Sequence, residues 1–206
     1  EQVEFLRGPN ALLFGRGGTG GIINRVTKKA VIGEEFGSVD VGTDTFGSLD
    51  LTYDYNVSSI DDSAFRINIH TDSLANHRDF YDGERMGVNP TMKFVMSDDT
   101  TLDLSYEYID HERFIDRGVP TIHGAPDESL IDIVFGTPDI NTTKVEATMF
   151  RGTLSQVFSD TRKGNLAVHS SSYEKMYQNL YVAGYDGTLV NMDGYRDPTE
   201  RDKLII

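Results

Sequence analysis

Apolar and polar residues alternate along most of the chain from residue 36 onward, with the period of two that is typical of β-strands. In "LDLTYDYNV", residues 49–57, the letters L, L, Y, Y and V share one face, while D, T, D and N share the other. The same alternation occurs in 63–73, 85–97 and 100–109. We therefore predict antiparallel strands that each have one apolar and one polar face.

Over the whole chain the pattern predicts seven strands and the start of an eighth. The seven cover 36–43, 47–57, 63–73, 85–97, 100–109, 143–158 and 162–175, and the eighth begins near Arg201. The last two of the seven alternate poorly. Pro90 has no backbone N–H to donate to a neighbouring strand, so it indicates a bulge or a strand boundary.

Strand length and aromatic placement favour membrane strands over a soluble β-sandwich, whose strands also have one polar face. The predicted strands are about ten residues long, the length that a tilted transmembrane strand needs. Tyr53 and Tyr55, and likewise Tyr106 and Tyr108, lie on the apolar face toward the ends of their strands. An interfacial belt of aromatic residues has this placement.

The connections point the same way. Short polar turns near 58–63, 97–100 and 159–163 alternate with longer connections over 74–84, 110–142 and 176–200. Outer-membrane barrels have short turns at one end and long loops at the other. We predict an all-β fold, a transmembrane antiparallel β-barrel, of which this chain supplies about seven or eight strands.

The composition of the chain excludes several classes of function. The 206-residue chain has a formal net charge of −14, which argues against a nucleic-acid-binding protein. It has no cysteine, which excludes disulfides, thiol catalysis and cysteine-ligated zinc. The five histidines have no metal-ligand spacing, and no nucleophile motif occurs. We expect no catalytic residue, no metal site, no cofactor and no enzyme activity.

The N-terminal stretch is rich in glycine. Gly15, Gly17 and Gly20 satisfy the spacing G-x-G-x-x-G of a dinucleotide-binding loop. Such a loop opens a helix, whereas the following "GIINRVTKK" predicts a strand, so a nucleotide site is not expected. We expect instead a tightly folded loop in which glycines allow positive φ angles and close backbone approach.

The segment "VEFLRGPNALLFGRGGTGGIINRVTKK" resembles the C-terminal part of the plug domain in TonB-dependent outer-membrane receptors. The resemblance implies that Arg7 pairs with barrel glutamates beyond Ile206 and so helps to hold the plug in place. It also implies that the plug turns use Gly8, Gly15, Gly17, Gly18, Gly20 and Gly21. The segments "DRGVPTIHGAP", "FGTPD" and "YEKMYQNLYV" are similar to the ferric-siderophore branch, especially its catecholate-type receptors.

The resemblance implies two regions: residues 1–32, the end of a plug domain, and residues 33–206, the first strands of a barrel of about 22 strands. We therefore expect the chain to be part of a longer protein of the bacterial outer membrane. Its expected partners are a ferric siderophore, TonB and outer-membrane lipid. Three alternatives remain open: a receptor for cobalamin or another metal chelate, a small complete barrel, and a soluble β-rich binding module.

Arginine and tyrosine in the long connections are the candidate ligand-binding residues. Arginine suits an anionic ferric siderophore because it donates several charge-assisted hydrogen bonds. The candidates are Tyr81, Arg113, Arg117, Tyr177, Tyr181 and Tyr195.

Overall fold

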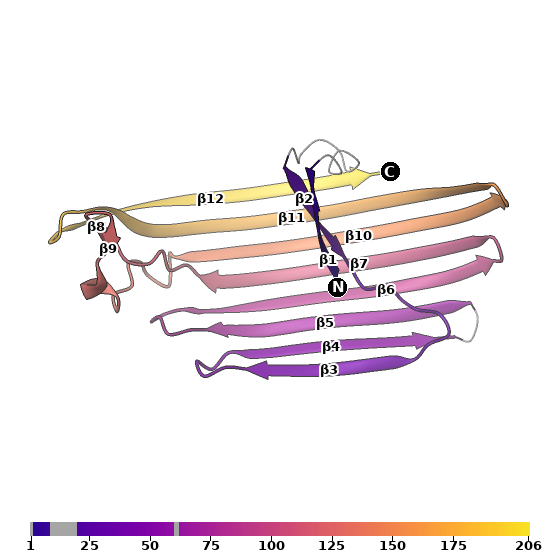
Figure 1. Cartoon of the computed structure of the whole chain (residues 1–206), viewed down its shortest axis with the longest axis horizontal. Coiled ribbons are helices and arrows are strands. Elements are labelled where there is room, and N and C mark those ends of the chain that lie inside the picture. Colours follow the sequence, from indigo (N-terminus) through magenta and orange to yellow (C-terminus); the bar gives the residue numbers. More distant parts are fainter. Residues whose placement is uncertain (1, 9–19, 60–61) are drawn as a thin grey trace.

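The chain forms two antiparallel sheets and a small hairpin (Figure 1). We describe a computed structural model that covers residues 2–8, 20–59 and 62–206. The smaller sheet pairs β1 (Gln2–Arg7) with β2 (Gly21–Val26), and we call this pair the N-terminal hairpin. Among the described residues, no helix is long and apolar enough to cross a membrane.

The main sheet has eight strands in the order β12-β11-β10-β7-β6-β5-β4-β3, so each strand lies beside its neighbour in sequence. The strands are β3 (Phe36–Thr43), β4 (Leu49–Ser58), β5 (Ser63–Ala75), β6 (Asp82–Ser97), β7 (Thr100–Phe114), β10 (Thr142–Ser159), β11 (Arg162–Tyr185) and β12 (Val190–Ile205). This antiparallel arrangement confirms the predicted all-β fold.

The predicted start of the eighth strand, near Arg201, was wrong. β11 runs on to Tyr185 and β12 begins at Val190, so the long connection predicted over 176–200 is only 186–189. Over 176–200 polar residues interrupt the apolar face: Gln178 lies between Met176 and Leu180, and β12 carries the polar run "YRDPTERDK". Without a continuous apolar face the period of two is lost, although the backbone pairing continues.

The prediction of several long connections at one end of the sheet was also too broad. Connections at that end are 44–48, 76–81, 115–141 and 186–189, of which only 115–141 is long. It contains the hairpin of β8 (Thr121–Ile122) and β9 (Ala125–Pro126), followed by the 3₁₀ helix η2 (Glu128–Leu130). The opposite end has tight turns, such as 98–99 and 160–161.

Pro90 neither bulges nor ends its strand. β6 passes through it, and the register with β7 is the same on both sides. The side-chain Nδ2 of Asn89 donates to the carbonyl of Tyr106 at 2.7 Å. That carbonyl lies opposite Pro90, so the Asn89 amide replaces the backbone donor that proline lacks. A register shift in β6 occurs instead between Val95 and Ser97.

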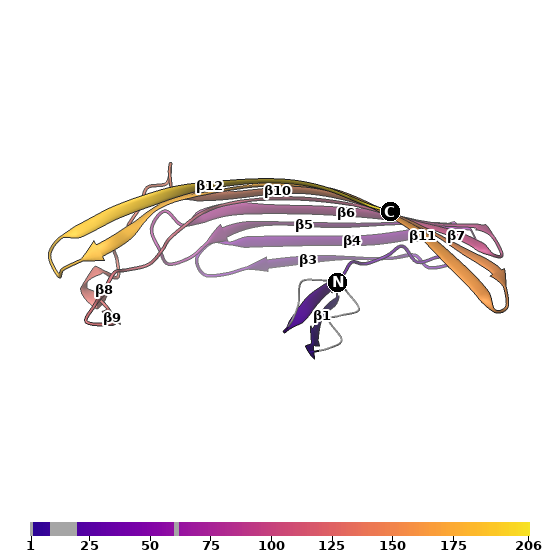
Figure 2. The ribbon, with the colours of Figure 1, turned by 90° about the horizontal axis from the view of Figure 1, so that it is seen from above.

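The sheet is arched, and the N-terminal hairpin lies on its concave side together with β8 and β9 (Figure 2). Among the described residues, most buried side chains are polar: Asp54, Asn56, Asp72, Thr91, Glu107, Asn141, Thr143 and Asn179. Large apolar side chains stay exposed on the other face, including Val41 at 67% and Leu51 at 38%. A soluble protein has the opposite arrangement.

The predicted placement of the tyrosines toward strand ends was wrong for Tyr53, Tyr106 and Tyr108. Tyr53 and Tyr55 lie on the apolar face of β4, with their rings stacked at 6.4 Å between centroids, but Tyr53 is at the middle of the strand and only Tyr55 lies toward its end. Tyr106 and Tyr108 share that face but lie near the middle of β7, because β7 extends to Phe114.

Candidate functional site

Two ion-pair clusters join the N-terminal segment to the polar face of the sheet. In the first, Lys28 Nζ lies 2.7 Å from Asp54 Oδ2, just beyond the end of β2. Arg66 of β5 holds the same carboxylate with two hydrogen bonds, Nε to Oδ1 at 2.8 Å and Nη2 to Oδ2 at 2.7 Å. Asp54 is buried, and two cations compensate its charge, as a buried carboxylate requires.

In the second cluster Arg25 of β2 contacts the carboxylate of Glu107 on β7. Arg151 of β10 approaches the other oxygen, with Nη1 3.7 Å from Oε2. Glu107 is buried, so it forms a negative centre between one arginine of the hairpin and one of the sheet. Sequence reasoning missed both clusters, although the basic "NRVTKK" and the acids on the polar face carried the signal.

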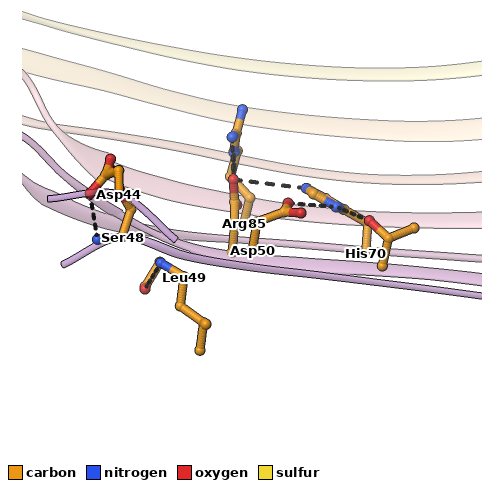
Figure 3. A network of polar contacts seen from close by, with 9 residues as sticks. Asp44, Ser48, Leu49, Asp50, His70 and Arg85 are labelled. Atoms are coloured by element: carbon orange, nitrogen blue, oxygen red, sulfur yellow. Dashed lines mark hydrogen bonds and ion pairs between the residues drawn. The ribbon is translucent and has the colours of Figure 1, made fainter. Parts of the chain in front are cut away.

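A third network lies on β4, β5 and β6 (Figure 3). His70 Nδ1 is 3.3 Å from Asp50 Oδ2, and its Nε2 is 3.8 Å from Asp72 Oδ2. These three residues offer ligand atoms within 4.8 Å of one another. However, Arg85 already donates from Nε to both oxygens of Asp72, at 2.9 and 3.0 Å. A guanidinium beside the donor set repels a cation, so the geometry fits an ion-pair network better than a metal site.

A cavity of about 420 Å³ lies between the N-terminal segment and the sheet. Its lining includes Arg25, Lys28, Arg85 and Glu107. In the part of the chain that the structure describes, the buried Nε2 of His111, also in the lining, has no hydrogen-bond partner. The cavity therefore offers free hydrogen-bonding groups as well as charge.

The structure brings four of the six candidate ligand-binding residues together, and we call Arg117, Tyr177, Tyr181 and Tyr195 the Arg117 cluster. Arg117 Nη1 donates to Tyr177 Oη at 3.3 Å, and its guanidinium lies 5.5 Å from the centre of the Tyr181 ring. The rings of Tyr177 and Tyr195 stack at 5.6 Å, and Tyr181 meets Tyr195 edge-on at 6.1 Å.

The strand register explains why these tyrosines converge. Tyr177 and Tyr181 are four residues apart on β11, so they share a face, and Tyr195 on β12 pairs with Asn179 between them. Sequence alone left them in a connection without defined geometry. The hydrogen bond that Arg117 donates to Tyr177, with a smaller contribution from Tyr195, raises the pKa of the exposed Arg117 above its usual value, so the guanidinium stays charged.

The other two candidates lie apart from the cluster. Arg113 of β7 shares a cross-strand row with Tyr177, with Thr143 of β10 between them. Two strand spacings, ~10 Å, therefore separate their backbones. Tyr81 lies in the connection 76–81, where its N–H donates to the carbonyl of Arg78 at 3.4 Å.

In the N-terminal hairpin, Arg7 is exposed at the end of β1, opposite Gly21. Its pairing with glutamates beyond Ile206 stays a prediction. Gly8 has a φ of +73°, and a Cβ on Gly21 would lie 2.7 Å from the Leu6 carbonyl oxygen. Gly20 has open space around it. The remaining predicted plug glycines, Gly15, Gly17 and Gly18, lie outside the described residues.

No protein-family model matches the chain. It is 28% identical over 199 residues to the metal-pseudopaline receptor CntO of Pseudomonas aeruginosa, a match that covers 95% of this chain and 27% of CntO. It is 31% identical over 169 residues to the catecholate siderophore receptor Fiu of Escherichia coli K12, covering 78% of this chain and 21% of Fiu. A third relative, 32% identical over 123 residues, is the probable TonB-dependent siderophore receptor PiuA of Acinetobacter baumannii, with 58% and 16% covered.

Solved structures agree with these sequence matches. The open form of the ferric-catecholate import receptor Fiu from E. coli K12 superimposes with a TM-score of 0.81 at 20% identity, covering 98% of this chain and 34% of that one. The siderophore receptor PiuA from A. baumannii gives 0.82 at 22% identity, with 99% and 31% covered. At this identity the likeness shows the fold, which is that of part of these receptors.

The chain belongs to the TonB-dependent receptors. It spans about a quarter of the length of CntO and less of Fiu and PiuA. This receptor segment is accordingly part of a bacterial outer-membrane protein. Its eight strands do not close, because β3 and β12 lie at opposite edges of the sheet. The alternative of a small closed barrel was therefore wrong, and the exposed apolar face contradicts the soluble module.

Proposed function

We propose that this receptor imports a ferric siderophore of the catecholate class across the outer membrane, with energy delivered through TonB. The observation that carries the proposal is the Arg117 cluster. Arg117 supplies a permanent positive charge next to three tyrosine rings, at the end of the sheet that bears the long connection. The name of the relative Fiu supports a catecholate siderophore, and that of PiuA supports a siderophore.

The chemistry of the cluster suits such a cargo. A ferric catecholate complex is anionic and presents flat aromatic rings. Arginine binds anionic oxygen with charge-assisted hydrogen bonds, and tyrosine offers both a stacking face and a hydroxyl. The Tyr177 and Tyr195 rings already stack on each other, so a further planar group would extend an existing aromatic surface.

The two regions of the segment take different roles in this proposal. Residues 1–32 act as the C-terminal part of the plug, and residues 33–206 as barrel wall. The Lys28–Asp54 and Arg25–Glu107 pairs then hold the plug against the wall, and Arg7 adds a further lock to strands outside this chain. The exposed apolar face of the sheet contacts outer-membrane lipid.

A second cargo, another metal chelate, is favoured by one observation. The match to the metal-pseudopaline receptor CntO covers nearly the whole chain, more than the match to Fiu. The Arg117 cluster would also bind a carboxylate-rich chelate, because arginine pairs with carboxylates in a bidentate manner.

Binding to the full-length receptor separates these possibilities. The probes are ferric 2,3-dihydroxybenzoate, a zinc chelate rich in carboxylates, and cobalamin, each titrated by quenching of intrinsic tyrosine fluorescence. We expect R117A to weaken ferric catecholate binding at least ~tenfold. The matched control R162A changes an exposed arginine at the opposite end of the sheet and should bind normally. Preferential binding of the zinc chelate or cobalamin would overturn the proposed cargo, and equal affinity of R117A and the parent would overturn the role of the Arg117 cluster in binding it.

A further inference from the structure

Arg78 connects three segments at the end of the sheet that carries the Arg117 cluster. It lies in the connection 76–81, and its Nε donates to Asp116 Oδ2 at 2.5 Å. Its Nη1 donates to the carbonyl of Ile131, and Nη2 donates to that of Ile133 at 2.9 Å. Only 12% of the Arg78 side chain and 11% of the Asp116 side chain is exposed, so the pair is largely shielded from water.

Asp116 transmits this attachment to the backbone around Arg117. While Oδ2 faces Arg78, Oδ1 accepts the N–H of Gly118 at 2.8 Å. The carboxylate therefore holds the residues on both sides of Arg117 in a tight turn, in which Gly118 has a φ of +78°. Arg117 itself stays exposed, so its guanidinium is free to reach the tyrosines.

The other side of the turn is fixed by Asn141, which is fully buried. The backbone carbonyl of Asn141 accepts the N–H of Ile115 at 2.8 Å. Its Nδ2 donates to the carbonyl of Leu180 at 2.9 Å, and its Oδ1 accepts the N–H of Leu180 at 3.1 Å. Leu180 precedes Tyr181 on β11, so the turn is tied directly to the strand that carries two of the cluster's tyrosines.

We propose that Arg78 is a positioning residue for the Arg117 cluster. It fixes the turn 116–118 so that the Arg117 guanidinium meets Tyr177 and Tyr181 before ligand arrives. Pre-ordering a binding group removes the entropy cost of fixing it during binding, and so raises affinity without a new contact. The inference rests on the proposed role of the cluster in binding ferric siderophore.

The planar fork of arginine explains why this position needs arginine. One guanidinium serves a carboxylate and two carbonyls at once, which the single ammonium of lysine serves less well. R78K should therefore keep the pair with Asp116 and lose part of the order in 128–133. We expect R78K to lie between the parent and R78A in every measurement.

The test uses the full-length receptor and has two independent measurements. Hydrogen exchange without ligand should be ~tenfold faster over 115–133 in R78A than in the parent, and unchanged in the matched control R162A. Ferric 2,3-dihydroxybenzoate should bind R78A ~tenfold more weakly. If Arg78 acts through Arg117, the double variant R78A/R117A should bind no more weakly than R117A.

The outcomes separate the two proposals. A parent receptor that binds no ferric catecholate overturns the proposed cargo, while the exchange measurement still tests whether Arg78 orders the turn. Additive losses in R78A/R117A, or faster exchange with unchanged affinity, would overturn the positioning role. If R78A does not reach the outer membrane, R78K and D116N decide the question by the same two measurements.

Discussion

Lys28 Nζ lies 2.7 Å from Asp54 Oδ2, and this contact joins the segment after β2 to the polar face of β4. Asp54 is buried, whereas 34% of the Lys28 side chain is exposed. The contact is thus partly screened by water, and its contribution is smaller than that of a fully buried pair. Because Arg66 binds the same carboxylate, removing Lys28 still leaves Asp54 a partner.

A double-mutant cycle measures this contact. We expect K28A and D54A to be coupled by about 1 kcal/mol in the free energy of unfolding. D54A should be the costlier single change, since it leaves the guanidinium of Arg66 without its carboxylate. Urea unfolding of the full-length receptor in lipid vesicles supplies the four values, and a coupling near zero would contradict the contact.

Glu107 is expected to hold the hairpin through Arg25. E107Q removes the charge that faces both Arg25 and Arg151, and we expect a loss of about 1–2 kcal/mol of stability. The value is modest because 39% of each arginine side chain is exposed. The matched control E112Q changes an exposed acid on the same strand. Thermal unfolding of the receptor in detergent compares the two, and equal midpoints would refute the role of Glu107.

Asn89 is expected to stabilise the sheet only because Pro90, which follows it, lacks a backbone donor. N89A leaves the Tyr106 carbonyl without its donor and should cost about 1–2 kcal/mol. P90A supplies a backbone N–H at the same place, so the cost of N89A should largely vanish in a P90A background. Urea titration of the four proteins checks this, with N165A as the exposed asparagine control. A cost of N89A that persists beside P90A would contradict the explanation.

The long connection should loosen in acid through Asp127. Hydrogen bonds from Ser129, and then from Tyr185, lower the pKa of this carboxyl below its usual value. The folded connection therefore favours the charged form. That stabilisation is present above the ordinary aspartate pKa of about 3.9 and is lost as pH falls through the lowered value.

Peptic cleavage of the connection between about pH 2 and pH 5 measures this change. The parent should be cleaved more slowly than D127N at the upper end of the range and at the same rate at the lower end. D132N, which changes another acid of the same connection, should behave like the parent. A constant ratio between parent and D127N would show that Asp127 does not anchor the connection.

The sequence by itself was enough to predict the strands that have one polar and one apolar face. From β4 to β7 the polar and apolar faces agree with the alternation, because one face meets the N-terminal segment and the other is apolar throughout. The alternation failed along the end of β11 and along β12, where polar residues such as Gln178 and Arg196 interrupt the apolar face. The extent of these strands is determined by backbone hydrogen bonds between β11 and β12, and the composition of the sequence does not reveal that pairing.

The tertiary structure alone decided which residues meet. Arg117 and Tyr177 are 60 residues apart, and Arg25 and Glu107 are 82 apart, so no local pattern pairs them. Sequence supplied the right residue types for a binding cluster, but Tyr81 and Arg113 were equally good candidates. Cross-strand pairing and the contacts of Arg78 and Asn141 select four of the six, because side chains converge only where the backbone holds them in one place.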